Sequence, residues 1–310
     1  IPWCMACGMT GRTIIRILVL GGATALIGVI LLGFSGRIFA PGDSAAILRP
    51  LAGGLLIPMA VILWFMKTRI TAFATMFVAV AALGSIAPGF MASGSNCDDG
   101  CLKLYQKNLM SKAWPRHSLA NDIIASGAEV VTLQEVSGHN RKFMASLFDH
   151  YPVAVFCKSR PYQDVAVLTS LPAVEGTEFC ESEIGLAGVQ VRYPKGQLIW
   201  VLSIHMKWPF PFDQFDQSQA IAERIAGLDG PVLVAGDFNM VPWGASVQRI
   251  RQAAGTHILG AFRTTHELGR PLLPLPIDTV LVPQGATGTV ELRGYLGSDH
   301  RGVLANIALQ

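Results

Sequence analysis

The chain has 310 residues, of which 51% are hydrophobic and only 15% are charged, and its formal net charge is +3. Soluble domains carry about 25% charged residues, so this composition excludes a single ordinary soluble domain, and the abundance of apolar side chains excludes a disordered chain. The residues before Gly94 include six Lys or Arg and one Asp. Since the whole chain has 24 Lys or Arg and 21 Asp or Glu, 18 basic and 20 acidic residues lie from Gly94 onward. The polar part is therefore slightly acidic, which argues against duplex DNA as its main ligand.

Three apolar stretches occupy the first third of the chain, at about residues 14–35, 50–66 and 70–91. A helix needs about 20 mainly apolar residues to cross a bilayer, and the first and third stretches have that length. A cleaved signal peptide followed by buried core helices is the alternative, but a signal peptide accounts for one stretch and not for three. We therefore predict that residues 1–93 form an all-α membrane region of three transmembrane helices.

Basic residues predict the orientation of these helices. Arg12 and Arg16 precede the first stretch, and Lys67 and Arg69 separate the second from the third. Lys and Arg are retained on the cytoplasmic side, so three crossings place the polar part outside the cytoplasm, in the periplasm of a bacterium. Four basic residues thus lie on the predicted cytoplasmic side and two on the opposite side, because Arg37 and Arg49 fall between the first and second stretches. The apolar cores of the stretches contain no ionisable residue, which disfavours a transporter.

Four of the six cysteines lie in the polar part of the chain. Cys97 and Cys101 follow the third apolar stretch, and Cys157 and Cys180 each end a strand-like run. An oxidising compartment permits Cys97–Cys101 and Cys157–Cys180 bridges, with free thiols as the alternative.

After the Ser-Gly-Ser segment at residues 93–95, short β-branched runs are mixed with helical stretches. Strands are predicted at 102–105, 130–133, 153–156, 165–168, 188–191, 198–204, 232–234, 279–282 and 302–307, and helices at 116–126 and 215–226. This mixture predicts one α/β domain over residues 94–310, large enough for a two-layer sheet core.

Polar residues follow these strands directly, which is how α/β scaffolds build sites. The segments are Gln106-Lys107-Asn108-Leu109, Leu133-Gln134-Glu135, Ser203-Ile204-His205, Gly236-Asp237-Phe238-Asn239, Ile277-Asp278 and Ser298-Asp299-His300. In this order they resemble the endonuclease/exonuclease/phosphatase (DNase I-like) superfamily over about residues 102–309, and most of all its bacterial membrane-anchored members. The resemblance implies a four-layer α/β sandwich of two mixed β-sheets flanked by helices. Such members commonly have histidine where this chain has Thr279.

Phosphodiester hydrolysis needs a metal, a positioned water and donors to the charge that develops on the phosphoryl oxygens. Mg²⁺ prefers oxygen ligands, which makes Glu135 the first candidate, and the resemblance adds Asn108 and Asp299. Mn²⁺ is the alternative ion. Taken alone, Glu135 is equally well interpreted as an exposed carboxylate at a strand end.

The catalytic candidates are His205, Asp237, Asn239, Asp278 and His300. Asp237 is assigned to orienting or deprotonating the attacking water and Asn239 to donating a hydrogen bond, with a simple Asp-Phe-Asn turn as the alternative. His300 is assigned to the phosphoryl oxygens and Asp278 to holding its ring. His205 is a second donor to the phosphate, the leaving-group acid, or a structural residue. The remaining histidines, His266 among them, have no comparable setting.

The residues that would select a substrate lie in two apolar segments, 206–212 and 271–276. They form either a lip beside the site or loops that pack onto the domain. The absence of a Gly-x-Ser-x-Gly motif, a P-loop or zinc-ligand spacing disfavours serine hydrolases, NTPases and zinc enzymes. We predict a membrane-anchored, Mg²⁺-dependent phosphoric ester hydrolase acting on a lipid head group, a nucleic acid or a small phosphoester. The alternative is a catalytically inactive, membrane-linked binding module of the same fold.

Overall fold

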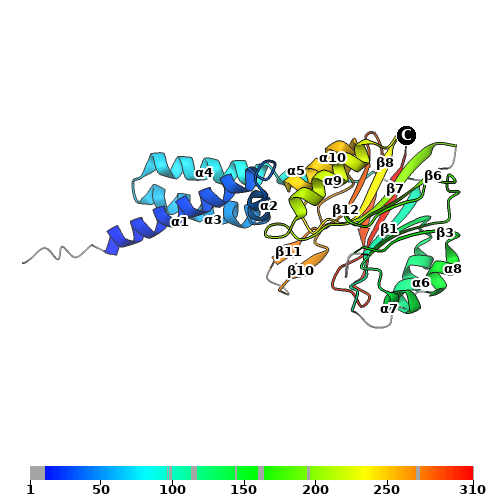
Figure 1. The fold of residues 1–310 in the computed structure, drawn as a ribbon. Helices are drawn as coiled ribbons and strands as arrows, with labels where there is room; N and C mark the ends of the chain where they lie inside the picture. Colours follow the sequence, from blue (N-terminus) through cyan, green and yellow to red (C-terminus); the bar gives the residue numbers. More distant parts are fainter. Residues whose placement is uncertain are drawn as a thin grey trace, which may run out of the picture. The chain divides into compact units, whose positions relative to one another are not determined.

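The computed structural model describes residues 11–95, 97, 100–112, 117–143, 145–159, 164–193, 196–269 and 273–309. The chain divides into two compact units, Ile1–Pro88 and Gly89–Gln310. Figure 1 shows that the first is helical, in blue to cyan, and that the second mixes helices and strands. The boundary lies slightly before the predicted one at residue 93.

The helical unit contains α1 (Gly11–Phe34), α2 (Ala40–Ile47), α3 (Arg49–Phe65) and α4 (Arg69–Gly84), and α5 (Ala87–Met91) crosses the boundary between the units. Its interior combines small residues, Ala52, Ala79 and Ala82, with the larger Ile30 and Leu56, and the small ones allow the helix backbones to approach closely. Large apolar side chains point outward, with Phe65 75% exposed and Phe77 74% exposed. This is the inverse of the arrangement that a water-facing helical bundle requires.

Among the described helices, α1 alone is long and apolar enough to cross a membrane by itself, with a mean hydropathy of 2.5. Helices α2 and α3 qualify only as a pair bent by 60°, and α4 is a shorter apolar helix. The third predicted stretch, 70–91, is not one continuous helix, because α4 ends at Gly84 and a separate helix begins at Ala87. Pro88 lacks the backbone donor that a continuous helix would need there. Arg49 lies buried at the start of α3, where its Nη2 donates to the carbonyl oxygen of Gly33 at 2.8 Å.

Two mixed sheets form the second unit. The first has the strand order β13 (Thr287–Leu292), β14 (Val303–Ala308), β1 (Leu102–Asn108), β2 (Val130–Gln134), β4 (Val165–Thr169) and β3 (Val153–Cys157). The second has the order β5 (Phe179–Glu181), β6 (Leu186–Arg192), β7 (Leu198–His205), β8 (Val232–Asp237), β12 (Asp278–Pro283) and β9 (Thr256–Ile258). In each sheet one central pair is parallel, β1 with β2 and β7 with β8. Strands β10 (His266–Leu268) and β11 (Leu273–Leu275) pair antiparallel in a separate two-stranded sheet.

The two sheets pack face to face around an apolar core, to which Leu104 and Val167 contribute from the first sheet and Val189 and Val201 from the second. On the outer face of the first sheet lie three helices, α6 (His117–Ser126), α7 (Gly138–Phe143) and α8 (Ala145–His150). Helices α9 (Gln214–Ala226) and α10 (Ala245–Ala253) lie beside β7 and β8 (Figure 1). Because both faces of the central strands are covered, their apolar residues are nearly continuous rather than alternating. The predicted sandwich of two mixed sheets flanked by helices is confirmed.

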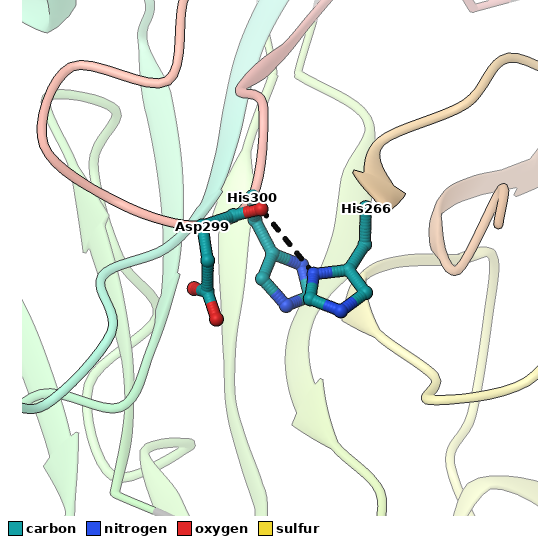
Figure 2. Close-up of side chains that lie close together, drawn as sticks. All are labelled: His266, Asp299 and His300. Carbon is teal, nitrogen blue, oxygen red and sulfur yellow. Dashed lines mark hydrogen bonds between the residues drawn. The ribbon is translucent and has the colours of Figure 1, made fainter. Parts of the chain in front are cut away.

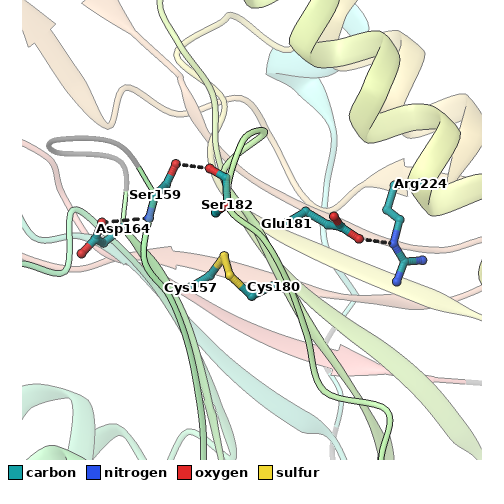
Figure 3. The surroundings of a disulfide bond; sticks show 7 residues. All are labelled: Cys157, Ser159, Asp164, Cys180, Glu181, Ser182 and Arg224. Atoms are coloured by element: carbon teal, nitrogen blue, oxygen red, sulfur yellow. Dashed lines mark hydrogen bonds and ion pairs between the residues drawn. A yellow bond between two sulfur atoms is a disulfide. The ribbon is translucent and has the colours of Figure 1, made fainter.

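A disulfide links the two sheets at one side of the sandwich. Cys157 ends β3 and Cys180 lies in β5, and each of these strands is the edge strand of its sheet. Figure 3 shows the bond together with the ion pair between Arg224 and Glu181, whose Nε and Oε1 lie 2.7 Å apart. The structure also contains the Cys97–Cys101 disulfide, so both of the bridges that the sequence analysis allowed are present, rather than free thiols.

Candidate active site

The site lies where the central strands of both sheets end. Asn108 ends β1 and Glu135 follows β2, and these two strands are parallel. In the second sheet, His205 pairs in register with Asp237, and Asp237 with Asp278. Parallel neighbours end at the same edge of a sheet, and β12 begins where its antiparallel neighbour β8 ends. The topology therefore brings residues that are far apart in the sequence to one place.

Asn108 connects the two sheets. Its Nδ2 donates to Asp237 Oδ2 at 2.9 Å and lies 3.3 Å from Glu135 Oε1. The other oxygen of Glu135 accepts a hydrogen bond from the backbone amide of Ser111 at 2.7 Å. One neutral amide therefore lies between two carboxylates that different sheets contribute.

Local backbone geometry turns the side chains at these strand ends. Glu135 and Asn239 have left-handed φ values of 56° and 46°, a conformation that costs a residue other than glycine about 1–2 kcal/mol. At Gly236, a Cβ atom would collide with the carbonyl oxygen of Ile204 in the neighbouring strand. The Gly-Asp-Phe-Asn segment therefore needs its glycine for the close approach of β7 and β8.

Two imidazoles flank Asp237. The Nε2 atoms of His205 and His300 lie 3.6 and 3.7 Å from Asp237 Oδ2, and His300 Nδ1 lies 2.8 Å from Asp278 Oδ2. Asn239 completes the arrangement through its backbone amide, which donates to Asp237 Oδ1, and through its Nδ2, which donates to the carbonyl oxygen of Met206. The five predicted catalytic residues thus lie together, and Asn239 fixes the position of Asp237 as well as carrying an amide of its own.

Burial and charge shift the protonation of this group. Burial raises the pKa of Asp237 to about 7 and lowers the pKa of His205 to about 4. Burial also opposes the charge of His300, but the carboxylates of Asp278 and Asp237 outweigh it and raise the pKa of His300 to about 10. Burial disfavours the charged carboxylate of Asp278, yet the nearby charge of His300 dominates and lowers its pKa. In the absence of a metal, positive charge therefore resides on His300 and is held there by Asp278.

A buried polar layer beneath the site was not assigned a role from the sequence. Gln106 Nε2 donates to both Gln134 Oε1 and Asp278 Oδ1 at 2.8 Å, and Gln134 Nε2 donates to Ser203 Oγ at 3.1 Å. The bonds of Gln106 to Asp278 and of Gln134 to Ser203 run from the first sheet to the second. The sequence did point to these positions, because Gln106, Gln134, Ser203 and Asp278 all stand in the strand-end motifs. It could not show which of them pair, because the packing of the two sheets determines their partners.

Lys107 holds the turn that carries Asp299 and His300. Its side chain is completely buried, and its Nζ donates to the carbonyl oxygens of Tyr295, Gly294 and His300. Ser298 adds a second attachment, because its Oγ donates to the carbonyl oxygen of Asn108 at 2.8 Å. The turn is therefore fixed to the end of β1.

The three predicted metal ligands lie at the end of β1 (Asn108), directly after β2 (Glu135) and in the turn before β14 (Asp299). Asn108 contacts Glu135, whereas Asp299 lies with His266 and His300, and the ligand atoms of these three lie within 4.8 Å of one another. Figure 2 shows this second group. His266, set aside in the sequence analysis, therefore lies beside His300. Its position depends on an isolated β-bridge to His300, for which the sequence gives no local signal.

A cavity of about 310 Å³ adjoins the carboxylate of Glu135. Lys158 and Asp164 both line it, so its walls carry charges of both signs. Thr279, in contrast, is buried and lines a separate small cavity with Phe262.

Two mixed sheets packed face to face, with carboxylates and imidazoles at their joined strand ends, define the DNase I-like class of α/β sandwich. The sequence profile of the Endonuclease/Exonuclease/phosphatase family matches residues 109–300, more than half of the chain, and the protein belongs to this family. Members of the family are phosphoester hydrolases. No curated protein sequence matches the chain.

Solved structures share the fold at low sequence identity. TDP2 of D. rerio, in complex with a single-stranded DNA product, has 17% identity and a TM-score of 0.56, with 68% of this chain and 100% of that chain covered. An endonuclease/exonuclease/phosphatase from Bacteroides vulgatus has 14% identity and a TM-score of 0.55, with coverage of 68% and 99%. A further one, from Beutenbergia cavernae, has 19% identity and a TM-score of 0.52, with coverage of 67% and 72%.

Proposed function

We propose that this protein is a membrane-anchored, divalent-metal-dependent hydrolase of phosphoester bonds that uses an activated water. The observation that carries the proposal is the Asn108–Asp237 hydrogen bond of 2.9 Å. It brings the carboxylate and amide end of the first sheet against the carboxylate and imidazole end of the second. Metal ligands, a base and phosphate donors are the groups that phosphoester hydrolysis requires.

The residues present fit a hard divalent cation. Glu135 and Asp299 supply carboxylate oxygens, and Asn108 supplies an amide oxygen that also accepts a hydrogen bond from the backbone amide of Met110 at 2.8 Å. Oxygen ligands are those that Mg²⁺ prefers, and Mn²⁺ accepts the same set. The neutral amide of Asn108 lies between the carboxylates of Glu135 and Asp237 and cannot neutralise their negative charge. A cation bound there would do so. When bound, the cation would neutralise phosphoryl oxygens and polarise the phosphorus toward attack.

Asp237 is suited to orient and deprotonate the attacking water. Its Oδ1 is held by the backbone amide of Asn239 and its Oδ2 by Asn108. Because burial raises the pKa of this carboxyl to about 7, it accepts a proton more readily than an ordinary aspartate. Asn239 keeps the carboxylate in place.

His300 and His205 are suited to bind the phosphoryl oxygens. Asp278 holds His300 through Nδ1, which directs Nε2 toward the Asp237 carboxylate. The pKa of His300 is raised to about 10, so its ring carries a proton to donate. The pKa of His205 is lowered to about 4, so it acts as a neutral imidazole with one N–H.

The surface beside the site favours a phospholipid head group or another small phosphoester over duplex DNA. Phe210 and Phe212, in the segment that follows His205, are 52% and 59% exposed. Trp208 in the same segment lies 6.1 Å from the ring of His266. Exposed aromatic residues next to a site are suited to contact lipid, and the slightly acidic domain is not suited to a polyanionic duplex.

The membrane assignment rests on the helical unit, whose outward-facing side chains are apolar, and on the basic residues between its helices. We propose three crossings, with α2 and α3 as one bent span and α4 as the shortest. The catalytic unit would then lie in the periplasm, where its two disulfides are expected to persist. A phosphatase reporter fused after residue 310 should be active, whereas a fluorescent cytosolic reporter fused there would contradict this topology.

The activity is tested with detergent-solubilised full-length protein and bis-p-nitrophenyl phosphate. Mg²⁺ should support hydrolysis, EDTA should abolish it, and Asp237→Ala should lower it by about 10²-fold or more. Asp213→Ala, which alters an exposed aspartate paired with Lys207, is the matched control. Hydrolysis that persists in EDTA or in Asp237→Ala would remove the assignment. A panel of single-stranded DNA, duplex DNA, RNA, sphingomyelin and inositol phosphates would then identify the substrate class.

A further inference from the structure

The second unit begins with Gly89 and Phe90, which lie in the short helix α5. The ring of Phe90 packs against two other rings of the same unit, with its centroid 5.8 Å from that of Trp243 and 5.4 Å from that of Phe262. Trp243 and Phe262 also contact each other, with their centroids 5.8 Å apart. These separations are typical of interacting aromatic side chains, so the three rings form a closed cluster.

The backbone at the start of this unit is packed as closely as the Phe90 ring. The carbonyl oxygen of Gly89 accepts a hydrogen bond from the backbone amide of Phe262 at 2.8 Å. A Cβ atom on Gly89 would overlap the ring of Phe262, so this ring rests directly on the glycine backbone. Further along, a Cβ atom on Gly94 would overlap the carbonyl oxygen of Gly288 in β13. The first residues of the second unit are therefore built into it and do not form a loose linker.

The two partners of Phe90 belong to the two segments that carry site residues. Trp243 lies four residues after Asn239, which ends the Gly-Asp-Phe-Asn segment. Phe262 lies three residues before Thr265, whose own amide donates to the carbonyl oxygen of Leu275 at 3.0 Å. Phe90 therefore joins a segment that leaves the site to a segment that enters it.

Thr265 connects the entering segment to the candidate catalytic residues. Its Oγ1 accepts hydrogen bonds from the backbone amides of Ile277 and Asp278 at 3.2 and 3.1 Å. Its carbonyl oxygen accepts from the backbone amide of Arg301, the residue after His300, at 2.8 Å. A displacement of Thr265 would therefore move both members of the Asp278–His300 pair.

We propose that Phe90 is a positioning residue of the candidate active site: with Gly89, it keeps the segment of Thr265 where Asp278 can hold His300. The inference rests on the proposed function, because the groups that it positions are those assigned to phosphoester hydrolysis. Misplacement of reacting groups by about 1 Å can lower a rate by about 10²-fold. Phe90 itself is 48% exposed, so its removal takes away less packing than the loss of a core phenylalanine, and the fold should survive.

The test uses detergent-solubilised full-length protein, Mg²⁺ and bis-p-nitrophenyl phosphate, a soluble substrate that removes any effect of lipid contact. Phe90→Ala should lower kcat by about 10-fold or more and leave KM nearly unchanged, because it alters the placement of reacting groups and not a contact with substrate. Phe90→Tyr keeps the ring and should retain the activity of the unaltered protein. Met91→Ala is the matched control, since the neighbouring Met91 side chain is 79% exposed.

Gly89→Ala provides a second, independent variant. Alanine favours a helix more than glycine does, so within α5 this substitution should be harmless or stabilising unless its Cβ atom displaces the ring of Phe262. We expect the displacement, and therefore a fall in kcat similar to that of Phe90→Ala.

Hydrogen exchange followed by mass spectrometry separates a positioning role from a general loss of stability. Phe90→Ala should speed exchange by about 10-fold in the peptide that contains the amides of Ile277 and Asp278, because these amides donate to Thr265. Exchange in the peptides of β6 should not change. Thermal melting verifies that each variant folds, and Gly89→Ala carries the test if Phe90→Ala does not fold.

An unchanged kcat in Phe90→Ala or in Gly89→Ala would overturn the proposal, and so would a kcat in Phe90→Tyr as low as that in Phe90→Ala. A fall in kcat without faster exchange at Ile277 and Asp278, or with equally faster exchange in β6, would also overturn it. Faster local exchange in a protein without hydrolase activity would refute the proposed function and leave the support of Asp278 intact. Hydrolysis that is indifferent to Phe90→Ala would refute the positioning role alone.

Discussion

Replacing Asp278 with asparagine should remove the charge that keeps His300 protonated. The rise in the pKa of His300 from 6.5 to about 10 corresponds to roughly 5 kcal/mol in favour of the imidazolium. Burial opposes this rise, and Asp278 and Asp237 produce it. Asparagine keeps the shape of the side chain and an oxygen for His300 Nδ1, so the change isolates the charge. A contacting charge shifts a pKa by about 1–3, so the pKa of His300 should fall to between about 7 and 9.

The measurement is a pH titration of ¹⁵N-labelled histidine by NMR in metal-free protein. Asp213→Asn is the control, because Asp213 is exposed and pairs with Lys207. The same variants should be assayed with bis-p-nitrophenyl phosphate, where Asp278→Asn should lower kcat/KM by about 10–100-fold. A pKa that stays near 10 in Asp278→Asn would refute the reasoning, because it would show that Asp278 does not hold the proton.

Three further predictions concern stability. The folded protein raises the pKa of His300 above its unfolded value, so the stabilisation is complete below about pH 6.5 and is lost as the pH rises through about 10. The melting temperature of metal-free protein should fall across that range, and a constant value would contradict the assignment. Replacing both Cys157 and Cys180 with serine opens a link between residues 23 positions apart. This should lower the free energy of unfolding by about 3 kcal/mol, as measured by urea titration and tryptophan fluorescence, and an unchanged midpoint would show that the bridge does not stabilise the fold. Lys107→Met leaves carbonyl groups of the turn without their donor, at a cost of about 1–3 kcal/mol each. Both the melting temperature and turnover should fall, and normal turnover would show that the turn does not depend on this lysine.

The central strands could be predicted because their runs of β-branched residues are long and buried on both faces. The strand predicted at 130–133 is β2, and the strand predicted at 198–204 is β7. The strands that were not predicted are short or lie at sheet edges, such as Thr287–Leu292, where buried and exposed positions follow no regular alternation. Their pairing partners lie far along the chain, so local sequence carries little information about them.

The clustering of the candidate catalytic side chains could be predicted where these residues belong to short motifs that contain several of them. Asp237 and Asn239 stand in one four-residue segment at a strand end, and the structure brings them together with His205 and Asp278. The position of His266 beside His300 could not be predicted, because it follows from an isolated bridge between the start of β10 and the turn before β14. In the helical unit, composition alone did not reveal that the third apolar stretch is interrupted after Gly84.

The hydrogen bonds that cross from one sheet to the other have a consequence for how the domain can move. Asn108 to Asp237, Gln106 to Asp278 and Gln134 to Ser203 all join residues of opposite sheets. Sliding of one sheet over the other would stretch all three bonds at once, and the disulfide at the edge opposes the same displacement. We therefore expect the two sheets to move as one body, so that a substrate would be accommodated by the surrounding loops.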